Sequence, residues 1–291
     1  RMGVFFFGMG YSSRATARAL DQLRDPDLPI AGTTRSADSA EAFSDTDYRI
    51  HIFDGEVPGP TLGEDLRQAT HVILSIPPDE RGDPALNLHR ADLDAAPNLE
   101  WIGYFSTVGV YGDFGGEWID ETAPTRPINA RSKQRVEAEQ AWRDYAERRG
   151  VPLFIERLAG IYGPGRSAFD KLREGTARRI VKPGQVFNRI HVDDIGRITA
   201  LAALANLAGT YNLADTEPAP PQDLVTYAAE TMGVAPPPEV QFETAKMTEM
   251  ARSFYSDNKR VSSKRLLAAL NTTLQYPTYR EGLDAIWKSH A

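Results

Sequence analysis

A lysine stands near the start of a predicted helix, in the stretch NARSKQRVEAE (residues 129–139). A lysine beside a cofactor usually tunes a neighbouring group that carries the proton. That group belongs one helical turn earlier, on the same face of the helix. For Lys133 this position holds Asn129. Because an amide is not a practical acid or base near neutral pH, the lysine lacks the proton-carrying neighbour that its setting predicts.

A glycine-rich loop near the N-terminus predicts a dinucleotide site. The stretch GMGYSS follows the first predicted strand and opens a helix. Gly8 and Gly10 permit a tight turn and a close approach of the backbone to a pyrophosphate, and the N–H groups of Tyr11, Ser12 and Ser13 favour an anion. Ser13 occupies the place of the usual third glycine. The alternative is a plain strand-to-helix turn, because a lone glycine pattern is weak evidence.

The ends of the next predicted strands supply further cofactor residues. The second strand ends in TTRS, where Arg35 and Ser36 replace the acidic residue that would bind the ribose of NAD. A guanidinium suits a 2′-phosphate and favours NADP, whereas a solvated surface arginine is the alternative. Asp54 would either contact the adenine amino group or cap a turn. The stretch SIPP, with Ser75 and Pro77, would lie against the middle of the cofactor.

These residues must be held by an alternating pattern of strands and helices. Apolar, β-rich runs predict buried strands at 4–7, 29–34, 49–53, 71–76, 101–106 and 151–157. A strong helix is predicted over 132–150, with Gly150 as its stop. The alternation predicts an α/β fold: a Rossmann-type, doubly wound parallel sheet with helices on both faces.

Beyond Gly160 the pattern changes, and glycines and prolines cluster. Helices are predicted near 193–207, 221–232, 263–270 and 279–288. A strand at 209–215 is expected to rejoin the main sheet. We therefore predict a dinucleotide-binding domain over residues 2–159, completed by 209–215, and a smaller, mixed substrate-side domain over 160–291.

Composition limits the classes of function. The formal net charge is −7 without a basic block, which argues against nucleic acid as the main partner. The chain has no cysteine, so thiolate catalysis and zinc–thiolate sites are excluded. No carboxylate spacing suggests a metal site. No apolar run reaches the length of a membrane span, and we expect cytoplasmic residence without membrane association.

Several motifs occur in one order and together resemble a known family. They are the glycine loop, FSTVGVYGD (105–113), NARSKQRVEAE, RLAGIYGPGR (157–166), NRIHVDDI (188–195), GTYNLAD (209–215) and the C-terminal segment from Asn258. The order resembles an extended short-chain dehydrogenase/reductase of the NAD-dependent epimerase/dehydratase type. The resemblance covers nearly the whole chain.

The resemblance implies three catalytic positions. A Ser or Thr after the fifth strand holds the substrate oxygen, and Thr107 matches it. The lysine of a Y-x-x-x-K motif binds the nicotinamide ribose and lowers the pKa of the tyrosine, and Lys133 matches it. The tyrosine position falls on Asn129, so the chain resembles atypical members that lack the active-site tyrosine. Tyr111 and Tyr162 are the nearest proton sources by motif, although each also fits a packed aromatic, Tyr162 more so.

Other polar residues allow a functional and a structural interpretation. His191 in HVDD is the most tempting histidine, but the resemblance places this segment at a helix start that Asp193 or Asp194 would cap. Arg166 and Arg189 are candidates for binding an anionic substrate, and Arg157 is a third. Exposed arginines more often have no specific role.

Two functions are consistent with these residues. The first is an NADP-dependent oxidoreductase or epimerase, with NAD as the alternative cofactor, acting on a small or sugar-nucleotide-like substrate with Asn129 as a hydrogen-bonding residue. The second is a non-catalytic dinucleotide sensor or regulatory protein. We also expect a homodimer, in which Trp142 and Tyr145 on the 132–150 helix could anchor the contact, the alternative being that this face packs within the monomer.

Overall fold

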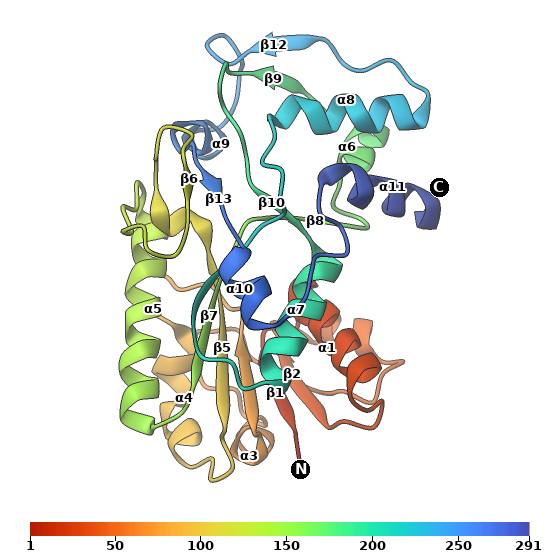
Figure 1. Ribbon diagram of the computed structural model, residues 1–291. Coiled ribbons are helices and arrows are strands. Elements are labelled where there is room, and N and C mark those ends of the chain that lie inside the picture. The colour runs from red at the N-terminus through yellow and green to blue at the C-terminus, as the bar shows by residue number, and fades with distance from the viewer. Residues whose placement is uncertain (291) are drawn as a thin grey trace. The chain divides into compact units, whose positions relative to one another are not determined.

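Seven parallel strands form the central sheet of the computed structural model, which describes residues 1–290 (Figure 1). They are β1 (Val4–Phe7), β2 (Ile30–Thr34), β3 (Arg49–Ile52), β4 (His71–Leu74), β5 (Trp101–Thr107), β7 (Leu153–Leu158) and β11 (Gly209–Leu213). Their order across the sheet is β11-β7-β5-β4-β1-β2-β3. The strand order therefore reverses between β1 and β4, which is where ligands bind in sheets of this type.

Helices cover both faces of this sheet (Figure 1). The helices α3 (Gly63–Gln68), α4 (Pro84–Asp94) and α5 (Ala130–Arg149) contribute to one large apolar cluster with the strands. On the other face, α1 (Tyr11–Leu23) and α7 (Val192–Leu204) approach so closely that a Cβ at Gly196 would lie 2.5 Å from the carbonyl oxygen of Ala15. The short helix α2 (Ala37–Ala40) follows β2. Because both faces are covered, successive residues such as Phe5, Phe6 and Phe7 are all fully buried.

The predicted α/β class and doubly wound sheet are confirmed. Each predicted strand is present, and its ends differ from the predicted ends by at most two residues. The predicted strand at 209–215 joins the edge of the sheet as β11. The predicted helix over 132–150 is α5, which begins at Ala130. Gly150 terminates it in a left-handed conformation with φ of 74°, a geometry that favours glycine.

Two compact units are interleaved along the chain. The first comprises Arg1–Thr107, Asn129–Arg157 and Ile195–Tyr211, and the second comprises Val108–Ile128, Leu158–Asp194 and the segment from Asn212 onward. The sequence predicted one boundary between residues 159 and 160. The segment 209–215 was expected to complete the first domain. The structure differs because most of α7 also belongs to the first unit, and because the loop after β5 and the chain from Asn212 belong to the second.

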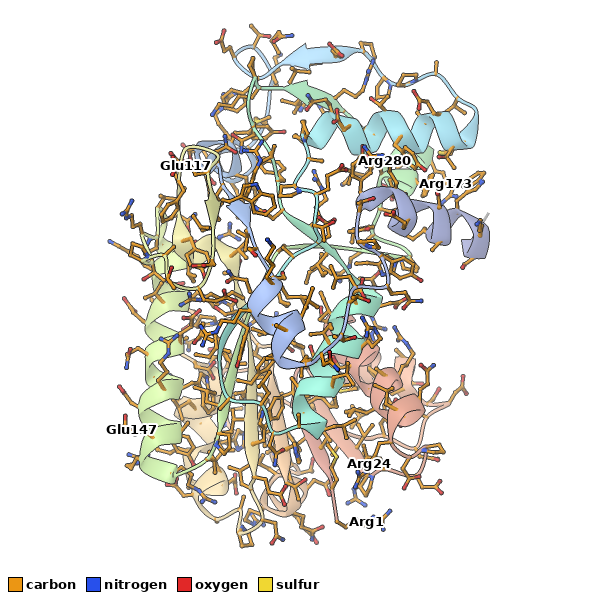
Figure 2. The ribbon with its side chains drawn as sticks, viewed as in Figure 1. Arg1, Arg24, Glu117, Glu147, Arg173 and Arg280 are labelled. Atoms are coloured by element: carbon orange, nitrogen blue, oxygen red, sulfur yellow. The ribbon has the colours of Figure 1, made fainter. Side chains whose placement is uncertain are left out.

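The second unit contains small strand pairs and helices. The pairs are β8 (Gly160–Tyr162) with β10 (Arg189–His191), β9 (Arg179–Val181) with β12 (Glu239–Gln241), and β6 (Trp118–Ile119) with β13 (Arg260–Val261). The helices are α6 (Ala168–Glu174), α8 (Pro221–Met232), α9 (Glu249–Ser253), α10 (Lys264–Ala269) and α11 (Tyr279–His290). Phe169, Leu224 and Leu283 form part of its core, whereas Arg173 on α6 points to solvent (Figure 2).

A glutamate is buried in the middle of β7. Glu156 has no exposed surface, and its Oε1 accepts a hydrogen bond of 2.7 Å from the hydroxyl of Thr199 on α7. Its Oε2 has no hydrogen-bond partner among residues 1–290. Burial raises the pKa of this carboxyl to about 8, because the ionised form loses its hydration. The side chain is therefore mostly protonated at neutral pH.

We expect Glu156→Gln to gain stability, relative to the wild type, as the pH rises. The carboxyl ionises near pH 4.5 in the unfolded chain but only near pH 8 in the folded protein. Across this window the unfolded chain binds fewer protons, so the wild-type free energy of unfolding falls with rising pH, by roughly 3 kcal/mol at pH 7. Glutamine is neutral at every pH and removes this loss.

Urea unfolding of both proteins at about pH 5 and about pH 8 measures the difference. Glu147→Gln, at a position on α5 that faces solvent (Figure 2), is the control for removing one carboxyl. If the free energies of unfolding of the wild type and Glu156→Gln differ by the same amount at both pH values, the pKa of the buried carboxyl is not raised.

Candidate functional site

A groove in the first unit lies at the carboxyl ends of β1, β2, β3 and β4, with a cavity volume of about 480 Å³. Six of the predicted cofactor residues line it, namely Gly8, Gly10, Arg35, Asp54, Ser75 and Pro77. Its remaining lining includes Met9, Thr33, Thr34, Ser39, Phe53, Glu56, Asp79 and Arg81. The sequence analysis named Asp54 but not Glu56, Asp79 and Arg81, because the loops after β3 and β4 give no pattern that assigns these three residues.

The glycine loop is shaped by close contacts at the strand-order reversal. Gly8 has a φ of +94°, and a Cβ there would lie 2.6 Å from the hydroxyl oxygen of Ser75. That hydroxyl also donates to the carbonyl oxygens of Phe7 and Gly8, at 3.1 and 2.8 Å. In contrast, a Cβ at Gly10 would meet no atom within 4 Å. Gly8 is thus needed for packing, and Gly10 leaves open space in front of the helix start.

The start of α1 fits an anion. Gly10 is the N-cap and offers no side chain to the helix N–H groups, and the first turn contains no acidic residue. Ser13, in the place of the third glycine, is buried, and its hydroxyl contacts the hydroxyl of Ser75 at 3.2 Å. Ser12 is also buried, whereas Tyr11 is half-buried. The backbone N–H groups of this helix start, with the partial positive charge of its dipole, are suited to a phosphate.

Charged residues occupy the outer part of the groove. Arg35 is exposed and has no hydrogen bond or ion pair within the described chain. Ser36 caps α2 by accepting a hydrogen bond from the N–H of Ser39. Asp54 accepts hydrogen bonds from the N–H groups of Glu56 and Val57, which lower the pKa of its carboxyl, and the nearby Arg35 lowers it further. Asp54 is therefore an ionised turn-forming residue at the groove.

Asn129 is the N-cap of α5. Its backbone is extended, and its Oδ1 accepts a hydrogen bond of 2.9 Å from the N–H of Ser132. The carboxamide oxygen is therefore engaged at the helix start, which leaves the Nδ2 hydrogens for other contacts. Lys133 follows in the first turn, and its side chain is exposed. Thr107 ends β5 and is half-buried. Neither Thr107 nor Lys133 lines the groove.

A buried ion network joins α5 to the sheet. Glu139 on α5 accepts hydrogen bonds from Arg157 on β7 at 2.7 and 3.1 Å, from Arg143 at 3.1 Å, and from the hydroxyl of Ser106 on β5. Arg157 was a candidate for an anionic substrate, and this is corrected because its guanidinium is buried against Glu139. The sequence places glutamates at 137 and 139 in the predicted helix and Arg157 in the predicted strand, but it does not show that Glu139 is the one that pairs with Arg157.

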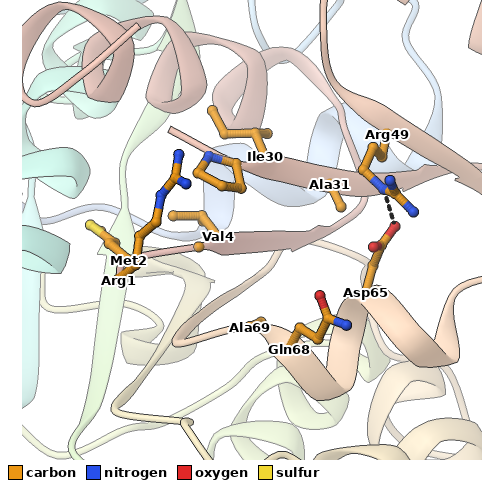
Figure 3. A pocket seen from close by; sticks show the side chains of 11 residues that line it. Arg1, Met2, Val4, Ile30, Ala31, Arg49, Asp65, Gln68 and Ala69 are labelled. Atoms are coloured by element: carbon orange, nitrogen blue, oxygen red, sulfur yellow. Dashed lines mark hydrogen bonds and ion pairs between the residues drawn. The ribbon is translucent and has the colours of Figure 1, made fainter. Parts of the chain in front are cut away.

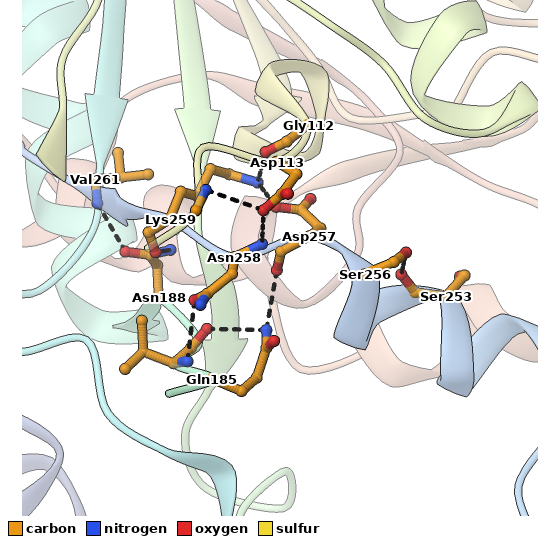
Figure 4. A network of polar contacts seen from close by, with 12 residues as sticks. Gly112, Asp113, Gln185, Asn188, Ser253, Ser256, Asp257, Asn258, Lys259 and Val261 are labelled. Carbon is orange, nitrogen blue, oxygen red and sulfur yellow. Dashed lines mark hydrogen bonds and ion pairs between the residues drawn. The ribbon is translucent and has the colours of Figure 1, made fainter. Parts of the chain in front are cut away.

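Tyr111 is one of the two candidate proton sources by motif. Its side chain is fully buried in the second unit, and its hydroxyl donates a hydrogen bond of 2.6 Å to Oδ1 of Asn212. The following loop is held by the buried Lys259, which donates to the carbonyl oxygen of Gly112 and pairs with Asp257 (Figure 4). Burial and the hydrogen bond to Asn212 agree with the packed-aromatic interpretation of Tyr111, and a role as proton donor stays a prediction.

The other aromatic and histidine candidates are also buried in the second unit. The ring Nδ1 of His191 accepts a hydrogen bond of 3.0 Å from the N–H of Asp193, and burial lowers the pKa of the ring. The carboxylate of Asp194 accepts hydrogen bonds from the N–H groups of Gln275 and Tyr276. Tyr162 is buried, and burial raises the pKa of its phenol. These contacts support structural roles.

Arg189 and Arg166, the two candidates for binding a substrate, differ in burial and in hydrogen bonding. Arg189 is half-buried, and it donates to the carbonyl oxygens of Phe187 and Ala219 at 3.2 and 3.1 Å. Burial lowers the pKa of its guanidinium to about 10. Arg166 is exposed, and its backbone pairs with that of Gly163. A role in substrate binding stays a prediction for both.

The proposed dimer anchors are corrected. Trp142 and Tyr145 are fully buried within the first unit, and Tyr145 donates a hydrogen bond of 2.8 Å to Asp94. They belong to the core cluster of the sheet, so they cannot anchor a contact with a second subunit. A single sequence does not separate a helix face that packs inside from one that packs against a partner.

Two further hollows contain none of the predicted site residues. A small one of about 150 Å³ lies at the amino ends of β1 and β2, where Arg49 pairs with Asp65 (Figure 3). A larger one, of about 640 Å³, is lined by Trp118, Asp120 and Arg265 among others. Among the side chains that the structure describes, no group of three or more His, Cys, Asp or Glu residues could hold a metal ion. No described helix combines the length and apolarity needed to cross a membrane.

Comparisons with known proteins agree with this geometry. The family model described as "NAD dependent epimerase/dehydratase family" matches residues 86–214. A search of curated proteins finds no match. A solved structure of a functionally unknown conserved protein from Silicibacter pomeroyi DSS is 44% identical, covers 99% of both chains and has a TM-score of 0.90.

Two more distant structures support the same fold. One, described as a "putative NAD-dependent epimerase/dehydratase" from Methylobacillus flagellatus, is 25% identical, with a TM-score of 0.73 over 99% of this chain and 98% of that chain. The other is UDP-glucuronic acid 4-epimerase from Bacillus cereus in complex with NAD, which is 18% identical with a TM-score of 0.74 over the whole of both chains. At this lower identity the likeness shows the fold alone.

We expect Asn129→Ala to destabilise the protein through loss of the helix cap. The alanine leaves the N–H of Ser132 without its acceptor, which costs about 1 kcal/mol of unfolding free energy. Asn129→Asp retains an acceptor at this position and should keep near wild-type stability. Urea unfolding of the three proteins measures this, and equal stability of Asn129→Ala and Asn129→Asp would contradict a capping role.

Proposed function

We propose that this chain, whose residues 86–214 match the model of the NAD-dependent epimerase/dehydratase family, is an NADP-dependent oxidoreductase or epimerase acting on a small or sugar-nucleotide-like substrate. The observation that carries the proposal is the groove at the strand-order reversal, where Gly10 leaves open space and Arg35 has no ionic partner in the described chain. A bound nicotinamide would supply hydride transfer.

The residues of the groove fit a dinucleotide. The N–H groups at the start of α1 would hold the pyrophosphate, because no side chain caps them. Arg35 would bind a 2′-phosphate, with Ser36 and Ser39 beside it as hydroxyl donors. Asp54 accepts two backbone hydrogen bonds and retains accepting capacity for an adenine amino group. NAD stays the alternative, since four of the structurally similar proteins are described with bound NAD.

The catalytic residues are proposed on the family pattern. Thr107 would hold the substrate oxygen, and Lys133 would bind the nicotinamide ribose. Asn129 would offer its Nδ2 hydrogens to a substrate, because its oxygen caps α5. The carboxamide of Asn129 supplies no transferable proton near neutral pH, in a position where acid–base help is normally worth about 10²–10⁴-fold in rate. Sugar nucleotides enter as a substrate class because one similar structure is described as a complex with UDP-glucose and NAD.

The second candidate function is a non-catalytic dinucleotide sensor. The hydroxyl of Tyr111 is buried and donates to Asn212, and the side-chain oxygen of Asn129 caps a helix, which supports a site that lacks a proton donor. This observation favours binding without turnover. Cytoplasmic residence and a homodimer remain proposals, and the dimer would have to use a surface other than Trp142 and Tyr145.

We expect NADPH to bind more tightly than NADH, and Arg35→Ala to remove the preference. Loss of a charge-assisted contact with the 2′-phosphate should weaken NADPH about tenfold and leave NADH within about twofold. Fluorescence titration of both cofactors measures this, with Arg24→Ala at the far end of α1 as the control (Figure 2). Equal affinity of the wild type for the two cofactors would end the case for NADP.

Lys133→Ala and Thr107→Val separate the two functions. In an enzyme, Lys133→Ala should raise the cofactor Kd, and Thr107→Val should lower turnover by about 10²-fold or more while leaving cofactor binding intact. In a sensor, Lys133→Ala weakens the cofactor and Thr107→Val changes nothing measurable. Cofactor titration and a screen of NADPH oxidation with carbonyl substrates, including UDP-linked keto-sugars, distinguish these outcomes. Hydride transfer unaffected by Thr107→Val would remove Thr107 from the site.

A further inference from the structure

We propose that Arg81 binds the adenine ring of the cofactor by stacking its guanidinium plane on the base, an inference that rests on the proposed dinucleotide function. Arg81 lies in the turn after β4 and lines the same groove as Gly8 and Arg35. The sequence pattern of dinucleotide-binding proteins specifies the glycine loop and the end of the second strand, and Arg81 belongs to neither segment. Together with Glu56 and Asp79 it forms a group that we call the Arg81 clasp.

The clasp holds the guanidinium in one plane. Arg81 donates to Oε2 and Oε1 of Glu56 at 2.8 and 3.0 Å, which is a bidentate pair. It also donates from Nη2 and Nε to Oδ2 of Asp79 at 2.8 and 3.3 Å. These contacts come from two loops, one after β3 and one after β4. The arginine side chain thus loses most of its rotational freedom before any ligand binds.

Stability does not account for this arrangement. The side chains of Arg81 and Glu56 are 54% and 61% exposed. Exposed ion pairs contribute little to folding, since water screens the charges and ordering long side chains costs entropy. A planar, pre-ordered cation on the wall of a groove is better explained by what the groove holds.

The place of the clasp corresponds to the adenosine half of a dinucleotide. The pyrophosphate would sit at Gly8 and Gly10, and the residue ending β2 marks the adenosine ribose, which is Arg35 here. The clasp lies beyond it, on the loops that follow β3 and β4. The same groove offers apolar walls from Phe53, Ile76, Pro78 and Pro84. A flat, mostly apolar base fits between such walls and a guanidinium face.

Arg81 and Arg35 differ in their charged neighbours, and this difference suits them to different parts of the cofactor. The donors of Arg81 are used by two carboxylates, and those carboxylates repel a phosphate. The faces of its guanidinium remain for a neutral ring. Arg35 has no ionic partner in the described part of the chain, so its donors suit the 2′-phosphate. Arg81 would therefore recognise what NADH and NADPH share, and Arg35 what distinguishes them.

The test compares Arg81→Gln with the wild type for four probes: NADPH, NADH, 5′-AMP and nicotinamide mononucleotide. We expect the Kd of the three adenine-containing probes to rise by a similar factor, about three- to tenfold, and that of nicotinamide mononucleotide to stay unchanged. Arg81→Lys keeps the charge without the plane and should show most of the loss. Arg67→Gln, which breaks an exposed pair with Asp92 outside the groove, is the matched control and should change none of the four.

Two results would overturn the inference while leaving the proposed function in place. Unchanged affinities in Arg81→Gln would show that Arg81 does not contact the base, and a loss confined to NADPH would show that it reads the phosphate. If the wild type itself binds neither the cofactors nor 5′-AMP, the dinucleotide function and the inference fail together. Urea midpoints of all variants check that folding is retained, as the exposure of Arg81 predicts.

Discussion

The buried ion network at Glu139 is the interaction on which the positions of the candidate catalytic residues depend. Glu139 is almost completely buried on α5, and it bonds Arg157 on β7 and Ser106 on β5. Two charges removed from water remain stable only when they are paired and hydrogen-bonded, and removing one partner typically costs roughly 3–5 kcal/mol. The network therefore sets how α5 lies along the sheet, and with it the position of the helix start that carries Asn129 and Lys133.

The groove has a different physical origin, which is the order of the strands. The strands β2 and β3 lie on one side of β1, and the strands β4, β5, β7 and β11 lie on its other side. The loops that follow β1 and β4 therefore run in opposite directions and leave a crevice between them. Ser75 closes the bottom of this crevice by bonding the carbonyl oxygens of Phe7 and Gly8. A side chain at Gly8 would displace that hydroxyl, so the loop and the neighbouring strand end are one structure.

Asn129 has a structural role at the start of α5, where its side chain caps the helix. A tyrosine there would bring a titratable hydroxyl, but it could not accept a hydrogen bond from the helix N–H as the asparagine does. The result is a helix start that is well capped and carries a lysine without a proton-transferring neighbour. A lysine can contact a cofactor without such a neighbour, whereas proton transfer requires a donor, so binding and turnover are separate questions for this protein.

The α/β class, the strands and the groove-lining residues Gly8, Gly10 and Arg35 were determined by the sequence alone, because hydrophobic periodicity and glycine placement are local signals. For residues whose partners are distant in the chain, only the tertiary structure shows which contacts they make and which roles those contacts allow. Tyr111 is paired with Asn212, Arg157 with Glu139, and Trp142 with the sheet instead of a second subunit. Arg81 gained its candidate role because Glu56, on another loop, holds its guanidinium. A side chain's chemistry depends on burial and on its partners, and those are set by packing between segments that no local pattern relates.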